Sequence, residues 1–256
     1  MSLRVRKGLF LGAAVVFGFL LVWGFSGLPD FGDYRGPYGT VLAGVAVEER
    51  AATNVVMSTT FDYRGFDTMG EEYILFAAVL GLVILLRDLR SERMDEEEEE
   101  QEESPVRRRR REASDALRVL GLALVGPLVM FGIYIVAHGH LTPGGGFQGG
   151  IILAAALILV SLAGRYPAMR RVRPIPLVEL AEGAGAAGYV LVGLGGLIAG
   201  AAFLYNFLPL GEPGTLLSAG TIPLLNISVG LEVTGAFVLL ISEFLDQEFV
   251  TGPGEE

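Results

Sequence analysis

Residues His138–Gly150 read His-Gly-His-Leu-Thr-Pro-Gly-Gly-Gly-Phe-Gln-Gly-Gly and separate two strongly apolar runs, Leu117–Ala137 and Ile151–Ala163. The stretch contains six glycines, one proline and both histidines of the chain. Glycine permits positive φ and close backbone approach, whereas proline lacks a backbone N–H and fixes φ, so the stretch cannot continue a helix. We therefore predict a sharp, tightly packed turn between two membrane helices. Irregular backbone at membrane depth survives only against protein or beside a wet cavity, so we expect a contact or pathway element.

The composition is that of a helical membrane protein. Of the 256 residues, 52% are hydrophobic, and the mean hydropathy is +0.52, with the charges concentrated between long apolar runs. We therefore expect an integral membrane protein without a large soluble domain. The absence of cysteine excludes disulfides, thiolate-bound iron–sulfur clusters and cysteine nucleophiles. Two histidines leave little for haem or zinc ligation, so we expect no cofactor and no metal.

Six apolar spans are expected, which makes the predicted fold all-α and polytopic. They are Gly8–Phe25, Tyr73–Leu86, Ala116–Ala137, Gly149–Ala163, Gly183–Tyr205 and Ile222–Leu245. The first has the outline of a cleavable signal peptide, but it is longer than a usual signal segment and no small-x-small site follows cleanly. We therefore favour a retained helix. Between the first two spans, Glu48–Thr60 is expected to form a short helix at the membrane interface.

The distribution of charge divides the chain into three parts. We expect a two-helix region over residues 1–90, a charged linker over residues 91–114 and a four-helix domain over residues 115–250. The linker is expected to be a solvated cytoplasmic strap, with binding of Arg107–Arg111 to anionic lipid as the alternative and no binding of nucleic acid. Basic clusters at the N-terminus, in the linker and at Arg165–Arg173 place both termini in the cytoplasm and the glycine-rich turn outside.

The glycine-rich turn also carries a resemblance. Gly-His-x-x-Pro-Gly-Gly-Gly-Phe-x-Gly-Gly between two hydrophobic segments resembles the B-type (MnhB-like) component of the Mrp-type multisubunit monovalent-cation/proton antiporters. A similar component occurs in the membrane arms of energy-converting hydrogenases. The resemblance covers roughly Ala116–Asp246. Its motif residues are Gly139, Pro143, Gly144, Gly145, Gly146, Phe147, Gly149 and Gly150.

A second, shorter resemblance lies upstream, at Asp62–Glu71. Asp-Tyr-Arg-Gly-Phe-Asp-Thr-x-Gly-Glu is similar to the C-terminal portion of the large A-type component of these antiporters, and to the small hydrogenase-arm component that corresponds to that portion. Residues 1–90 therefore resemble a piece of the A-type component fused ahead of an MnhB-like domain. Two independent motifs indicate the same kind of complex.

The resemblance implies one membrane subunit of a sodium/proton antiporter in the cell membrane of a prokaryote, a transporter subunit rather than an enzyme. The expected partners are the other subunits, the lipid bilayer, and Na⁺ (or K⁺ or Li⁺) and H⁺ as transported ions. The chain alone is not expected to transport. The alternative is the membrane arm of a hydrogenase or related redox-driven ion pump, because Pro223–Glu232 resembles the final helix of that version more than that of many MnhB-like antiporter components. A third alternative is a pure scaffold.

Glu232 is the sharpest single candidate for the ion pathway. It lies ten residues into the last span, which places it about 15 Å along the helix and near the middle of the bilayer. A charge at that depth costs several kcal/mol, and such residues usually face a bundle interior or a wet cavity. A role in ion or proton movement, a protonated carboxyl bonded across a helix interface, and contact with a neighbouring subunit are the three alternatives.

The other pathway candidates lie near expected helix ends: His138, His140, Glu179, Glu182, Asp67 and Glu71. The histidines are expected either to cap and bond the turn or to relay protons. Glu179 and Glu182 are expected to precede a helix and either stabilise its N-terminus or pass protons from the cytoplasm. Asp67, Glu71 and the adjacent Glu72 present the same two alternatives at the start of the second span.

Overall fold

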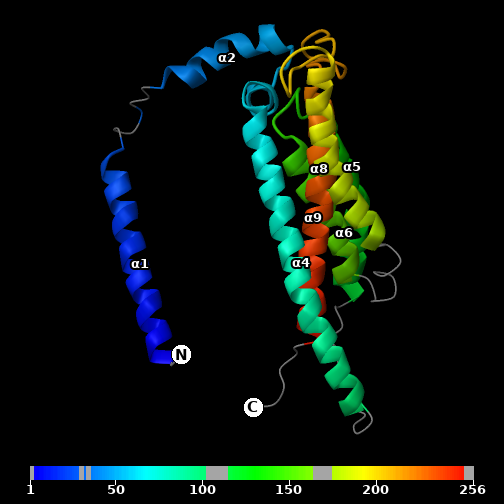
Figure 1. Ribbon diagram of the computed structural model, residues 1–256. Coiled ribbons are helices and arrows are strands. Elements are labelled where there is room, and N and C mark those ends of the chain that lie inside the picture. The colour runs from blue at the N-terminus through cyan, green and yellow to red at the C-terminus, as the bar shows by residue number, and fades with distance from the viewer. Residues whose placement is uncertain (1–2, 29–31, 33–35, 102–114, 164–174, 251–256) are drawn as a thin grey trace. The chain divides into compact units, whose positions relative to one another are not determined.

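The computed structural model describes residues 3–28, 32, 36–101, 115–163 and 175–250, and every regular element in these ranges is helical (Figure 1). The expected all-α fold is therefore confirmed. The elements are α1 (Leu3–Ser26), α2 (Pro37–Arg50), α3 (Val55–Ser58), the π-helical turn η1 (Thr59–Tyr63), α4 (Gly65–Gln101), α5 (Asp115–Ala137), α6 (Gly146–Ala163), α8 (Ile175–Ile198) and α9 (Ile222–Val250).

Five of the described helices are long and apolar enough to cross a membrane. The stretches are Lys7–Ser26, Gly65–Leu86, Arg118–Ala137, Pro176–Ile198 and Ile222–Phe244. A sixth apolar helix, α6, is shorter, with its apolar part at Gly146–Val160. Its 18 residues nevertheless reach about 27 Å, close to the thickness of a bilayer core. The chain is a polytopic membrane protein.

The chain divides into two compact units, Met1–Val41 and Leu42–Glu256. The first contains α1, whose apolar stretch has no buried residue and is apolar all round. A helix of this kind is stable in lipid without protein contacts. The second unit holds all the other apolar helices.

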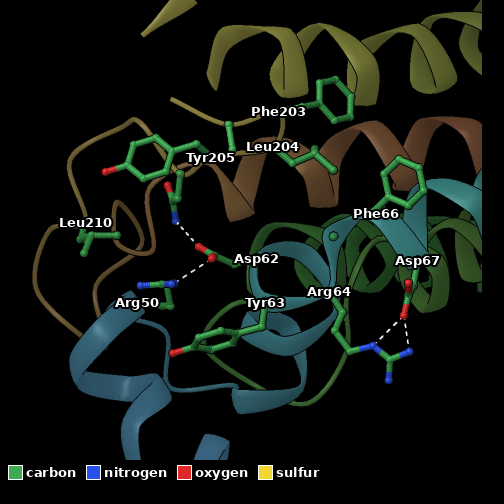
Figure 2. A pocket seen from close by; sticks show the side chains of 13 residues that line it. Arg50, Asp62, Tyr63, Arg64, Phe66, Asp67, Phe203, Leu204, Tyr205 and Leu210 are labelled. Carbon is green, nitrogen blue, oxygen red and sulfur yellow. Dashed lines mark hydrogen bonds and ion pairs between the residues drawn. The ribbon is translucent and has the colours of Figure 1, made fainter. Parts of the chain in front are cut away.

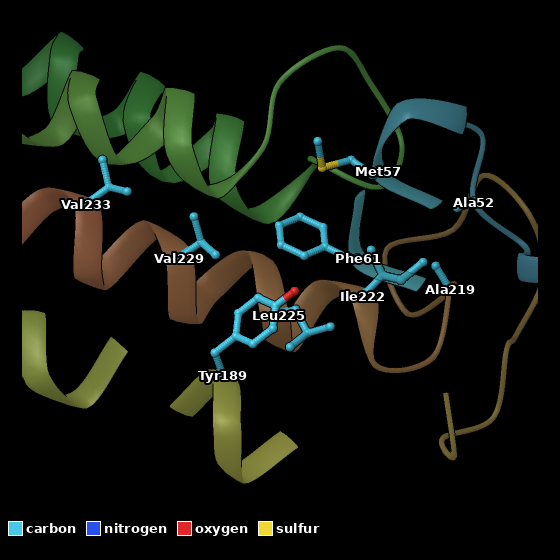
Figure 3. Packing of buried hydrophobic residues seen from close by; sticks show 9 residues of the cluster. All are labelled: Ala52, Met57, Phe61, Tyr189, Ala219, Ile222, Leu225, Val229 and Val233. Atoms are coloured by element: carbon cyan, nitrogen blue, oxygen red, sulfur yellow. The ribbon is translucent and has the colours of Figure 1, made fainter. Parts of the chain in front are cut away.

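Helix α9 is the centre of the second unit. Its apolar stretch is 61% buried, against 11% for that of α4, and it packs against α4, α5, α6 and α8. Leu225, Val229 and Val233 of α9 lie in one hydrophobic cluster with residues from α3, η1 and α8 (Figure 3). A second cluster continues along the same helix with Ala236, Val238 and Leu239.

Glycines allow the other helices to approach α9 closely. An added Cβ at Gly150 of α6 would lie 2.8 Å from Val233 Cβ, and one at Gly185 of α8 would lie 2.6 Å from the carbonyl oxygen of Ser228. On the far side of α6, a Cβ at Gly149 would lie 2.8 Å from the carbonyl oxygen of Gly132 in α5. Real side chains do not fit at such distances, so these glycines set the helix spacing, as small residues do in membrane bundles.

Three helix boundaries differ from expectation. Helix α8 spans Ile175–Ile198 rather than Gly183–Tyr205, because Ile175–Ala181 is itself apolar and the chain leaves the helix at Gly200, with φ +81°. Helix α6 begins at Gly146, since its first glycines pack as a helix against α9. The single helix expected over Glu48–Thr60 is broken, because Ala51 has φ +50° and Asn54 caps a new helix by accepting from the Val56 N–H at 3.2 Å.

Helix α4 is longer than its apolar span at both ends. It begins at Gly65, so Asp67 and Glu71 lie inside the helix, and it continues to Gln101 through the first part of the expected linker. The rest of that linker, 102–114, and the basic run Arg165–Arg173 lie outside the described residues. The division into three parts therefore stays a prediction.

Candidate functional site

The predicted turn occupies only the first part of the glycine-rich stretch. Residues 138–145 leave α5 and enter α6, whereas Gly146–Gly150 form the first turns of α6. Gly144 and Gly145 have φ of +147° and +146°, where a side chain is strained. An added Cβ at Gly139 would lie 2.7 Å from Asn226 Nδ2, so the turn is packed against α9 as a contact element.

The segment before α3 binds this turn through its backbone. The Asn54 side chain donates from Nδ2 to the carbonyl oxygens of Gly139 at 2.7 Å and Thr142 at 2.9 Å. The Asn54 backbone N–H donates to the His140 carbonyl at 3.1 Å, and Thr53 Oγ1 donates to the Leu141 carbonyl at 2.6 Å. Residues 53–54, which precede the second sequence motif, therefore donate hydrogen bonds to the backbone carbonyls of the glycine-rich turn, although about 85 residues separate the two segments.

A buried asparagine ties α6 to α9. Asn226 has no exposed surface, and its Oδ1 accepts from the Gly146 backbone N–H at 2.9 Å. That N–H is one of the free donors at the start of a helix, so Asn226 caps α6 from a neighbouring helix. The predicted motif residues Gly139 and Gly146 thus share one contact on α9.

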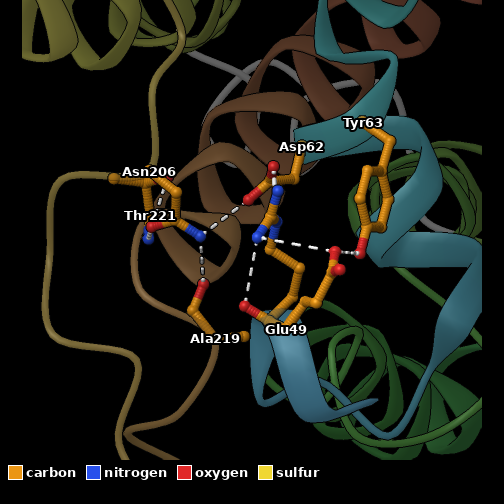
Figure 4. A network of polar contacts seen from close by, with 7 residues as sticks. Glu49, Asp62, Tyr63, Asn206, Ala219 and Thr221 are labelled. Carbon is orange, nitrogen blue, oxygen red and sulfur yellow. Dashed lines mark hydrogen bonds and ion pairs between the residues drawn. The ribbon is translucent and has the colours of Figure 1, made fainter. Parts of the chain in front are cut away.

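A polar network at the same end joins η1 to the loop before α9 (Figure 4). Asn206 Nδ2 donates to Asp62 Oδ2 at 2.9 Å, its Oδ1 accepts from the Thr221 N–H at 2.7 Å, and Arg50 Nε lies 2.7 Å from Asp62 Oδ1. Tyr63 donates to Glu49 Oε2 at 2.5 Å. Burial, followed by this hydrogen bond, raises the pKa of Tyr63 to about 12.

A cleft of about 520 Å³ opens beside this network (Figure 2). Arg64 and Asp67 form an ion pair at its edge, with Arg64 Nε 2.6 Å from Asp67 Oδ2, and both side chains are exposed. Asp67, a candidate for the ion pathway, therefore lies in this cleft and is neutralised by a neighbour. The remaining lining comes from Arg50 at the end of α2, from η1, from the start of α4 and from residues 202–206 with Leu210.

Three buried glutamates lie together deeper in the bundle, one from each of three helices. Glu232 of α9 has no exposed surface, and Glu72 of α4 and Glu182 of α8 are 2% and 6% exposed. The Glu72 carboxyl lies beside that of Glu232, and Glu182 lies within electrostatic reach of Glu232. Neither oxygen of Glu232 has a hydrogen-bond partner among the described residues, and one oxygen each of Glu72 and Glu182 also lacks one.

Two glycines provide the space next to two of these glutamates. Gly185 of α8 lies against the Glu232 backbone, and an added Cβ there would lie 2.6 Å from Glu232 Cβ. Conversely, an added Cβ at Gly235 of α9 would lie 2.8 Å from Glu182 Cβ. The two helices are antiparallel, so these two close contacts hold Glu182 about one turn from Glu232 along the bundle axis. The three carboxyls of Glu72, Glu182 and Glu232 are called here the carboxyl row.

From the sequence, Glu72 is considered only beside Asp67 and Glu71 at the start of the span and is not singled out, although a signal for it exists. The buried face of α4 contains Thr68, Glu72 and Val79, and Leu75 packs against both hydrophobic clusters. These positions follow helical spacing, so the pattern assigns Glu72 to the buried face and Glu71 to the opposite one. The structure agrees, since Glu71 is exposed.

The remaining candidates lie away from the row. Glu179 is exposed near the start of α8. His138 is half-buried, stacks on Tyr134 with ring centroids 4.2 Å apart, and has Nδ1 3.1 Å from the Tyr134 carbonyl. His140 is completely buried, and burial lowers its pKa below the ordinary value of 6.5. In the part of the chain that the structure describes, no three acidic or histidine side chains are arranged to hold a metal ion.

Comparison with known proteins gives a consistent picture. Residues 116–239 match the model of a domain related to the MnhB subunit of Na⁺/H⁺ antiporters. The chain is 35% identical over 127 residues to the B-type component of the Na⁺/H⁺ antiporter of Bacillus subtilis, covering 47% of this chain and 85% of the relative.

Two solved structures share the fold across almost the whole chain. A chain of the membrane-bound sulfane sulfur reductase, an archaeal respiratory membrane complex, has a TM-score of 0.69 at 31% identity, covering 94% of this chain and 98% of that one. A chain of the Mrp complex from Dietzia sp. DQ12-45-1b has a TM-score of 0.68 at 24% identity, covering 95% of this chain but only 26% of that one. Both the Mrp complex and the respiratory complex therefore contain this arrangement of helices.

Proposed function

Because the chain belongs to the family of proteins related to the MnhB subunit of Na⁺/H⁺ antiporters, we propose that it is a membrane subunit of a multisubunit monovalent-cation/proton antiporter. The match to the B-type antiporter component of Bacillus subtilis is the observation that carries the proposal, because it covers 85% of that relative. The membrane-spanning fold agrees with it. The chain works together with the other subunits of such a complex.

A redox-driven complex is the second candidate function. It is favoured by the 31% identity to a chain of a respiratory complex that this chain matches over 98% of its length. The chain's own residues do not discriminate, because it contains no cysteine for a cluster and the same fold occurs in both complexes. Purification of the native complex separates the two: iron–sulfur or nickel-containing subunits support the redox complex, and a complex without them supports the antiporter.

The carboxyl row is the part of this chain that takes part in ion movement. Glu232 lies near mid-membrane, and the group beside its carboxyl is another acid, Glu72, rather than the basic or amide donor that a purely structural glutamate acquires. Glu72 lies beside Glu232 and Glu182 lies within electrostatic reach of it, so a proton released by one carboxyl has a second acceptor nearby. This arrangement supports a path across the second unit.

The mobile species in the row is the proton rather than the alkali cation. Carboxyls that lie next to one another without a cationic partner exchange protons one at a time. The Na⁺ path then lies mainly in other subunits.

The orientation follows the charge pattern. We assign the protein to the cell membrane of a prokaryote, with both termini in the cytoplasm, and the glycine-rich turn and the cleft outside. Internal Na⁺ (or K⁺ or Li⁺) then leaves in exchange for external protons.

The test is Glu232→Gln in the assembled complex, assayed for Na⁺-dependent proton movement in everted membrane vesicles. We expect a loss of about tenfold or more, because the amide cannot carry a proton. Glu212→Gln, an exposed acid in the loop before α9, is the matched control and keeps full activity. Undiminished exchange by Glu232→Gln at every pH would refute the role of the row. Transport by the purified chain alone would refute its role as one part of a complex.

A further inference from the structure

An acidic side chain on α4 faces away from the bundle within a membrane span. Glu71 is exposed although it adjoins the buried Glu72 and lies inside Gly65–Leu86. Asp67, Glu71, Ile74 and Ala78 recur at helical spacing and are all exposed, with Ile74 at 72%. These four residues define one stripe on the face of α4 that does not contact α9, called here the α4 stripe.

Two contacts place Glu71 deep in the membrane. Its neighbour Glu72 lies beside Glu232, which is ten residues and about 15 Å from the start of α9. In addition, the Gly65 carbonyl accepts from Tyr189 at 2.8 Å, and Tyr189 lies nine residues, or about 14 Å, before the end of α8. Helix α4 therefore begins well below the ends of its neighbours, and Glu71 lies near the middle of the bilayer.

A carboxyl at this depth is not stable against lipid. Ionisable side chains near mid-membrane face protein or water, and pair with a donor. Inside the bundle, Glu71 has neither a protein environment nor a hydrogen-bond donor, because its side chain is exposed and the carboxyl row contains only further acids.

We propose that the α4 stripe docks onto a transmembrane helix of a different subunit, which presents a basic or amide side chain to Glu71 at mid-membrane depth. The inference rests on the proposed function in one respect, that the chain works within a complex. Asp67 adds no net attraction, since Arg64 already pairs with it, so recognition is centred on Glu71. The apolar positions Ile74 and Ala78 supply close packing below the polar contact.

Two other candidate occupants of the α4 stripe complement the charge of Glu71 less well. Helix α1 of the same chain has no lysine, arginine, histidine, asparagine or glutamine between Gly8 and Phe25, so it offers no such donor at this depth. A second copy of the chain docking by the same stripe would set Glu71 against Glu71, and like charges across an interface cost affinity. A heterologous partner with a donor is therefore the occupant that complements the stripe.

The first experiment identifies the neighbour directly. The chain has no cysteine, so Ile74→Cys carries a single photoactivatable label in the natively assembled complex. Mass spectrometry of the cross-linked product is expected to identify a helix of another subunit with lysine, arginine, histidine, asparagine or glutamine within one turn of the attachment point. Attachment to α1, to a second copy, to lipid alone or to a helix without such a donor would overturn the proposal.

The second experiment tests the charge. The tagged full-length chain is purified, and the amount of the neighbouring subunit that co-purifies with it is measured. Glu71→Lys is expected to lower this amount by about tenfold or more, because the lysine would face the basic or donor group of the neighbour. Glu71→Gln keeps most of the recovery, and the exposed loop variant Glu212→Lys keeps all of it. Unchanged recovery with Glu71→Lys would overturn the proposal. Both readouts are independent of transport, so a failed exchange assay leaves them interpretable, and loss of the docking leaves the family assignment intact.

Discussion

The turn end of the bundle and the carboxyl row use polar residues in opposite ways. At the turn end, Asn54, Asn206 and Asn226 each bind backbone or side-chain groups of segments far away in the sequence, although Asn226 Nδ2 has no hydrogen-bond partner among the described residues. In the carboxyl row, Glu72, Glu182 and Glu232 are as deeply buried, yet they face one another without donors for the oxygens that lie inside.

The asparagines at the turn end therefore stabilise the fold, whereas the buried glutamates are accommodated by the fold at a cost in stability. A buried amide with partners repays its desolvation and fixes the geometry of irregular backbone. A buried acid without partners lowers stability, so its presence calls for a functional explanation. The close contacts at Gly185 and Gly235 support this distinction between the two kinds of polar residue, because both glycines lie where α8 and α9 pack around the acids.

The largest expected effect comes from filling a glycine contact at the turn end. Gly146→Val would force a side chain into the Asn226 carbonyl and Val229, and we expect a loss of about 3 kcal/mol or more in unfolding free energy. Gly81→Val on α4 is the matched control, because nothing lies within 4 Å of its added Cβ. Chemical denaturation in detergent measures both, and equal stabilities would contradict the packing described here.

A smaller loss is expected from Asn54→Asp. The change keeps an oxygen to cap α3 but removes the Nδ2 donor to the Gly139 and Thr142 carbonyls. We expect about 2 kcal/mol of destabilisation, since two hydrogen bonds are lost and a charge faces carbonyl oxygens. The same denaturation assay applies. A stability equal to that of the wild type would show that the turn does not depend on the preceding segment.

The turn end was largely predictable from the sequence. Positive φ at Gly144 and Gly145 and close contacts at Gly139 follow from the residue types, since few other side chains tolerate such backbone. The partners Asn54 and Asn206 were not predictable, because they come from segments about 85 and 15 residues away from the groups they bind. Hydrophobic periodicity gives no information about such tertiary pairings.

The carboxyl row was predictable only in part. Glu232 stands out because it is the single acid in the middle of an apolar run. Glu72 does not, since the apolar run around it begins only at Tyr73 and the depth of α4 depends on its contacts with α8 and α9. Glu182 was expected before its helix, whereas α8 begins seven residues earlier and carries the side chain inward.

Glu232→Met is expected to separate the stability of the chain from the activity of the complex. Removing an unpartnered buried acid in favour of an apolar side chain of similar size should leave unfolding free energy unchanged or raise it by about 1 kcal/mol. Proton exchange by the assembled complex should be lost in the same variant. A loss of stability as large as that of Asn54→Asp would place Glu232 with the structural residues instead.

The smallest effect concerns His140, the buried residue at the turn end whose ring nitrogens have no hydrogen-bond partner among the described residues. Burial lowers its folded-state pKa below 6.5, so its neutral ring is compatible with the fold above that pH. As pH falls below 6.5, the unfolded chain takes up a proton that the folded chain does not, and stability falls until the folded-state pKa is reached. Between about pH 7.5 and about pH 6 the loss is expected to stay below about 1 kcal/mol, and His140→Gln should remove it. His138→Gln is the control, because that ring is already bonded to the Tyr134 carbonyl and stacked on its side chain. Parallel pH profiles of unfolding free energy for the wild type and His140→Gln would mean that the turn end accepts a charged ring as readily as a neutral one, which the burial of His140 argues against.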